Sequence, residues 1–136
     1  MLQLYRYLDR LVEELPQDDA FTLYAIRDWV AAIRSGRCAQ VTLRGRFVAR
    51  QIDAALLAFQ CAMTLVDRHG HGTMRFAPPY YHGVGDDEAR ILTLFSVARV
   101  EGASLMRIAT SLVSDDMASQ LAGAATKFGS ALRIRT

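Results

Sequence analysis

The sequence has few of the residues that build disulfide frameworks and common metal centres. It contains 2 cysteines, Cys38 and Cys61, with no C-x-x-C pair, and this excludes a disulfide scaffold. It has 3 histidines and no H-E-x-x-H motif. Cys61 lies within an apolar helical stretch, so we expect a small buried hydrophobic residue there.

Lysine is almost absent as well, and the net charge is small. Lys127 is the only lysine, which leaves 15 arginines among the 16 Lys and Arg residues. The arginines are scattered along the chain, and the formal net charge is +2. A nucleic-acid-binding protein usually carries a clustered basic surface, so charge alone does not indicate that function.

Long hydrophobic runs are missing too. The longest apolar stretch, 52–66, is interrupted by Asp53 and Gln60 and falls short of the roughly 20 residues that a bilayer requires. The N-terminal residues MLQLYRYLDRLVEEL alternate apolar and charged side chains, unlike a signal peptide. We therefore expect a cytoplasmic protein with no membrane segment.

The composition that remains is typical of a globular domain. Apolar residues make up 51% and charged residues 22% of the 136 residues, which excludes a disordered chain. A chain of this length most simply forms one domain over 1–136.

Apolar residues recur at helical spacing in most segments. The first predicted helix covers 2–15 and is stopped by Pro16. The second begins after a cap at Asp18 or Asp19 and ends at Gly36. Further helices are expected at 43–68 and 89–101, from Ser104 to Leu112, and from Ser114 onward.

The segment 43–68 has an apolar repeat close to seven residues and predicts one helix of roughly 39 Å. The repeat comprises Leu43, Phe47, Val48, Ile52, Leu56, Phe59, Met63 and Val66. In an alternative interpretation, Val41 and Leu43 form a short strand that pairs with Met74 and Phe76. The repeat extends back to Leu43, and this favours the helix.

These elements predict an all-α fold, a compact bundle of five to six helices. An irregular connector rich in Pro, Gly and His occupies about 69–86, and the alternative strand pairing would add only a minor two-stranded β element. A small chain has limited interior for so many apolar stripes, so we expect a symmetric homodimer. The terminal helix 2–15 is the predicted contact.

The connector holds all three histidines and suggests a metal site. His69, His71 and His82 with Asp86 would suit zinc or non-haem iron, with a coordination position open for water. Gly70 and Gly72 make the backbone around His69 and His71 flexible, which raises the cost of ordering metal ligands there. The acids at 86–88 lie where a helix begins, and capping alone explains them. No cofactor is therefore predicted, and a zinc or iron enzyme is kept as an alternative.

Four connector residues have no simple local role: His71, Tyr80, Tyr81 and His82. We predict that they line a small ligand pocket. The run Pro78-Pro79-Tyr80-Tyr81 also matches the P-P-x-Y pattern that WW domains bind as a polyproline II helix. We favour a stiff structural connector over that recognition motif.

A third alternative is nucleic-acid binding through Arg44, Arg46 and Arg50, whose guanidinium groups would contact phosphates. Acidic residues elsewhere nearly balance the charge. The sequence therefore predicts a non-catalytic binding or interaction module that acts as a homodimer, with another protein or a small ligand as further partners.

Overall fold

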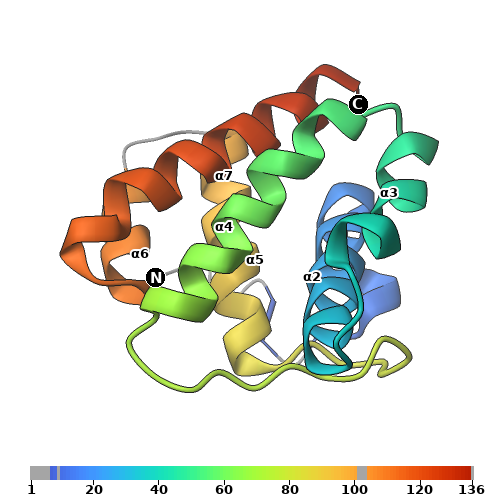
Figure 1. The fold of residues 1–136 in the computed structure, drawn as a ribbon, viewed down its shortest axis with the longest axis horizontal. Helices are drawn as coiled ribbons and strands as arrows, with labels where there is room; N and C mark the ends of the chain where they lie inside the picture. The colour runs from blue at the N-terminus through green and yellow to red at the C-terminus, as the bar shows by residue number, and fades with distance from the viewer. Residues whose placement is uncertain (1–6, 9, 101–103, 136) are drawn as a thin grey trace.

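The computed structural model describes residues 7–8, 10–100 and 104–135 (Figure 1). Six α-helices and two short 3₁₀ helices form this described part, which contains no strand. The all-α bundle that the periodicity predicts is confirmed. The elements in chain order are η1 (Val12–Glu14), α2 (Gln17–Arg34), α3 (Ala39–Ala49), η2 (Asp53–Ala55), α4 (Leu56–His69), α5 (Asp86–Val100), α6 (Leu105–Leu112) and α7 (Asp115–Arg135).

The helices pack around α7, which contacts α4, α5 and α6. In Figure 1, α4 and α7 run side by side across the front of the molecule, with α5 behind them. Helices α2 and α3 pack against each other on the other side, and the connector 70–85 runs along the lower edge. No helix in the described part is long and apolar enough to cross a membrane.

Five phenylalanine rings join five helices at the centre of the core. Phe128 of α7 contacts the other four rings, with centroid distances between 5.1 and 6.5 Å. These separations are typical of favourable aromatic pairs. The neighbouring Gly129 lets α7 approach α5, because a Cβ there would lie 3.1 Å from Arg99 Cα. The other four rings are Phe21 of α2, Phe47 of α3, Phe59 of α4 and Phe95 of α5.

The single helix predicted over 43–68 is wrong, because the chain turns between α3 and α4. Gln51 has a φ of 60°, the left-handed conformation. Its N–H donates to the Val48 carbonyl at 2.9 Å, and the Ile52 N–H donates to the Phe47 carbonyl at 3.0 Å. This pair of bonds is a Schellman motif, which ends a helix. The alternative strand is also absent, since Val41 lies within α3.

The helix predicted over 2–15 is wrong in the part that the structure describes, and 1–6 and 9 lie outside the described residues. Leu11 forms an isolated antiparallel bridge with Gly83, followed by the short helix η1. The Val12 N–H donates to the His82 carbonyl at 2.7 Å. The connector therefore supplies the backbone partners that an α-helix would have supplied internally.

Helix α2 ends as predicted at Gly36, but the predicted cap at Asp18 or Asp19 is wrong, because the helix begins at Gln17 after Pro16. Gly36 has a φ of 72° just after the helix, as expected for a C-terminal glycine. Asp18 and Asp19 lie in the first turn but make no cap bond. They accept hydrogen bonds from Arg50 and Tyr7, respectively, and so join α2 to other segments.

The prediction that Cys61 is buried is wrong. Its thiol is exposed and free. The buried side of α4 consists of Leu56, Phe59, Ala62, Met63 and Val66, and Cys61 lies on the opposite side. Helical periodicity separates the two sides correctly, but the apolar character of cysteine does not show which side it occupies.

Replacing Gln51 with glycine should stabilise the protein by about 0.5–1 kcal/mol, because glycine adopts a positive φ without steric cost. Urea denaturation measures the change. The control is Gln120→Gly at an exposed position of α7, which should lower the free energy of unfolding by about 1 kcal/mol. Equal destabilisation by both changes would contradict the role assigned to Gln51.

Candidate functional site

The connector 70–85 is fixed at its first end to the junction of α6 and α7. The Ser114 N–H donates to the His69 carbonyl at 3.1 Å, and the His71 N–H donates to the Leu112 carbonyl at 3.2 Å. The His71 ring nitrogen Nε2 lies 2.9 Å from the Thr110 carbonyl oxygen, so this nitrogen carries a proton and donates it. His71 is thus a structural anchor.

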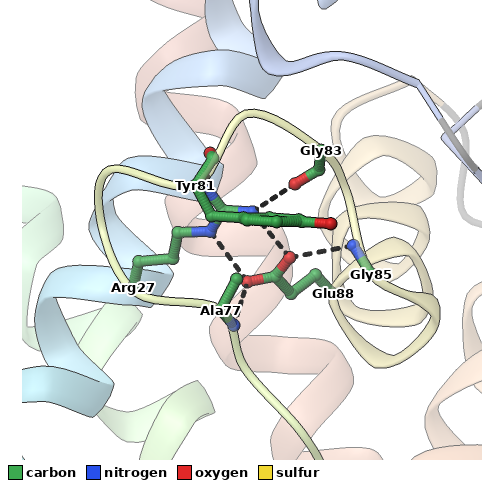
Figure 2. A network of polar contacts seen from close by, with 6 residues as sticks. All are labelled: Arg27, Ala77, Tyr81, Gly83, Gly85 and Glu88. Carbon is green, nitrogen blue, oxygen red and sulfur yellow. Dashed lines mark hydrogen bonds and ion pairs between the residues drawn. The ribbon is translucent and has the colours of Figure 1, made fainter.

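The second end is fixed by the buried side chain of Arg27 on α2 (Figure 2). Its guanidinium donates two hydrogen bonds to the Glu88 carboxylate, each 2.8 Å long. It also donates to the Tyr81 carbonyl at 2.7 Å and to the Gly83 carbonyl. The Tyr81 ring centroid lies 5.9 Å from the guanidinium carbon. One side chain therefore joins α2, α5 and the connector.

Glu88 accepts two further hydrogen bonds from the backbone of the connector. The Ala77 N–H and the Gly85 N–H each donate at 3.0 Å (Figure 2). Glu88 is the third residue of α5, so its bond to Gly85 is the reciprocal half of a capping box. The predicted helix-start role of the acids is confirmed for Glu88, and the ion pair adds a second role.

Both side chains of this pair are 0% exposed, so the pair is isolated from water. A buried charge is tolerated only when it is paired and hydrogen bonded, and here both groups have several partners. No buried side-chain nitrogen or oxygen atom lacks a hydrogen-bond partner anywhere in the described residues. We call these six residues, Arg27, Ala77, Tyr81, Gly83, Gly85 and Glu88, the Arg27–Glu88 network.

Between its two anchors, the connector borders a cleft of about 430 Å³. Met74 and Phe76 are partly buried and alternate with the exposed Thr73 and Arg75, which indicates an extended segment laid across α2 and α4. This alternation suggested a strand, but the segment packs on helices instead. The cleft is lined by Trp29, Val30, Ile33, Arg34, Met63, Val66, Asp67, Gly72, Thr73, Met74 and Phe76.

The lining of the cleft is mainly apolar and carries one charge of each sign. Arg34 lies in the last turn of α2, and Asp67 lies near the end of α4. Neither has an ion-pair partner among the described residues. A volume between roughly 300 and 1,000 Å³ and a few polar groups in an apolar wall are typical of small-molecule sites.

The four residues predicted to form a ligand pocket are distributed along the connector. His71 is held at α6, whereas Tyr81 and His82 lie beside Arg27 and Val12. The Tyr80 side chain is 80% exposed. The Tyr81 N–H donates to the Pro78 carbonyl at 3.0 Å, so the P-P-x-Y run forms a turn and supports the structural interpretation.

The proposed metal ligands are not assembled into a site. Within the residues that the structure describes, no group of three or more His, Cys, Asp and Glu side chains could hold a metal ion. His69 and His71 interact with the segment 110–114, while His82 pairs through its backbone with Val12. The geometry therefore offers no support for zinc or iron at His69, His71, His82 and Asp86.

Two of the three clustered arginines are used inside the protein. Arg46 donates to Asp28 at 2.6 Å, and Arg50 donates to Asp18 at 2.7 Å. Both pairs hold α3 against α2. Arg44 remains exposed without an ion-pair partner in the described part, and one guanidinium group is a weak basis for phosphate recognition.

The sequence interpretation overlooked both Arg27 and the cleft. A signal for Arg27 exists, because it follows Leu23 by four residues and precedes Val30 by three on the apolar side of α2. An arginine at such a position indicates a buried pair. Its partner Glu88 is 61 residues away and has no comparable local signal.

Comparisons with known proteins add no relative. A scan against protein-family models found no match, and searches of curated proteins and of solved structures found none either.

Replacing Glu88 with glutamine should lower the free energy of unfolding by about 3–5 kcal/mol. The amide leaves the Arg27 charge uncompensated and places an N–H₂ group against other donors. Urea denaturation measures the loss, and Glu13→Gln at an exposed position should change stability by less than about 0.5 kcal/mol. A similar small change for both variants would show that the buried pair is dispensable.

Proposed function

We propose that this protein is a non-catalytic binding module that acts as a homodimer and holds a small, mainly apolar ligand in the cleft. The observation that carries the proposal is the cleft itself, a hollow whose lining residues are mostly apolar and whose border is a connector fixed at both ends. A fixed wall reduces the entropy lost when a ligand binds, which favours affinity.

The side chains of the cleft suit an apolar ligand body. Its lining includes the aromatic residues Trp29 and Phe76 and the methionines Met63 and Met74. Methionine is flexible and polarizable, so it adapts to ligands of different shape. These groups supply apolar contact area, but they fix the orientation of a ligand only weakly.

The two charged side chains of the cleft would orient the ligand. Arg34 can donate to an anionic group of the ligand, because its planar guanidinium group matches carboxylates and sulfonates. Asp67 can accept from an N–H or O–H group. The proposed ligand class is therefore an apolar molecule whose polar end contains an acceptor and a donor.

The homodimer rests on surface composition. The exposed large hydrophobic residues in the described part include Val41 and Val48 of α3 and Leu57 at the start of α4. A monomer gains nothing by exposing a group of such residues, whereas a symmetric partner would cover them.

The fluorescent probe 1-anilinonaphthalene-8-sulfonate tests the cleft, because it combines aromatic rings, an N–H group and a sulfonate. Trp29 is the only tryptophan in the chain and lines the cleft, so its emission reports occupancy. We expect saturable quenching of Trp29 with one probe bound per chain. Arg34→Gln should weaken binding roughly tenfold, and Asp67→Ala should weaken it as well, because it removes the acceptor for the N–H group of the probe.

Arg37→Gln is the matched control, since Arg37 is exposed just beyond α2 and does not line the cleft. It should leave the affinity unchanged within about twofold. The near-UV circular dichroism spectrum of each variant should match that of the original chain, which excludes binding of the probe to a loosened core. Absence of saturable Trp29 quenching, or equal effects of Arg34→Gln and Arg37→Gln, would overturn the cleft as the binding site.

A further inference from the structure

The most exposed aliphatic side chains of the described residues gather on α3 and the start of α4. Leu57 is 72% exposed, Val41 is 67% exposed and Val48 is 51% exposed. Val41 and Val48 are seven residues apart on α3, so they lie on the same side of the helix. A cluster of exposed aliphatic groups on adjacent elements is typical of an interaction surface.

This surface also contains a hollow with one charge of each sign. The hollow has a volume of about 240 Å³, and Arg44 of α3 and Asp53 of η2 both line it together with Val48 and Leu57. Neither Arg44 nor Asp53 has an ion-pair partner in the described part of the chain. Arg44 differs in this respect from Arg46 and Arg50, which both form ion pairs within the chain.

We propose that this α3–α4 face, defined by Val41, Arg44, Val48, Asp53 and Leu57, is the two-fold interface between copies of the chain. The assignment deepens the proposed homodimer and depends on it. A two-fold axis places the same surface on both sides, so residue i contacts j while j contacts i. Arg44 of one protomer then pairs with Asp53 of the other, and the pair occurs twice.

A second copy fits this face better than an unrelated partner because the face complements itself. Apolar groups meet apolar groups, and each charge meets its opposite across the axis. Helix α3 has 11 residues and is about 16 Å long, enough to form the central contact of an interface. Gln40 and Ala54 also line the hollow and are exposed. They give the face a rim of one polar side chain and one small side chain.

Sedimentation equilibrium of the full chain over a concentration series tests the assignment. The chain should be a dimer, and Leu57→Asp should weaken the dimer at least tenfold. Met106→Asp is the matched control, because Met106 is 46% exposed on α6, away from the α3–α4 face. That variant should change the dimer dissociation constant by less than twofold.

A charge exchange gives a sharper test of the Arg44–Asp53 pair. Arg44→Glu and Asp53→Arg should each weaken the dimer at least tenfold, because each variant creates two like-charge contacts. The variant with both changes should recover the affinity to within threefold of the original chain. Far-UV circular dichroism confirms that each variant is folded.

The outcomes separate the two proposals. A chain that remains monomeric at high concentration overturns both the homodimer and this interface. A dimer that is insensitive to Leu57→Asp and to both single charge changes overturns the interface but retains the homodimer. Failure of the double variant to recover, although both single variants dissociate, overturns the assigned charge pair. Probe binding in the cleft is measured separately and tests neither point, since the cleft shares no residue with the α3–α4 face.

Discussion

The buried ion pair between Arg27 and Glu88 is the constraint on which the site depends. The connector spans sixteen residues from 70 to 85 without a helix or strand of its own. A segment of this kind has backbone groups that need partners when they are covered by protein. The pair supplies four such contacts and joins the connector to α2 and α5 at the same point. The part of the cleft wall that the connector forms is therefore held at its second end by the buried ion pair rather than by regular secondary structure.

The core and the connector are stabilised by different kinds of interaction. Five phenylalanine rings bring α2, α3, α4, α5 and α7 together, and their contribution follows from burial of apolar area. Such burial tolerates small adjustments in ring position. The Arg27–Glu88 network instead requires particular donor and acceptor positions, and it holds the connector backbone at Ala77, Tyr81, Gly83 and Gly85. We infer that the core holds the bundle together, while the network shapes the candidate site.

Much of the bundle could be predicted because its helices begin and end at residues with strong local preferences. Gly36 ends α2, and Asp86 and Glu88 lie in the first turn of α5, as expected. The break at Gln51 could not be predicted in the same way. Glutamine is a good helix former, so its sequence neighbourhood does not indicate the positive φ at the turn after which Phe59 of α4 packs against Phe47 of α3.

The candidate site was harder to predict than the fold. The sequence predicts a ligand pocket from the histidines and tyrosines of the connector, yet His71 bonds to the Thr110 carbonyl and Tyr80 is largely exposed. The cleft depends on side chains from α2, α4 and the connector, such as Trp29 and Met63, which have ordinary apolar positions in the sequence. Nothing local distinguishes a core residue from one beside a hollow.

The sequence by itself determined the helical class, the segments that are amphipathic and the position of the irregular connector. Hydrophobic periodicity carries this information, because it reflects which side of each helix must avoid water. Only the tertiary structure decided the turn at Gln51, the pairing of Arg27 with Glu88 and the location of the cleft. These features depend on contacts between residues far apart in the chain, and no local pattern specifies which distant partner a buried group will meet.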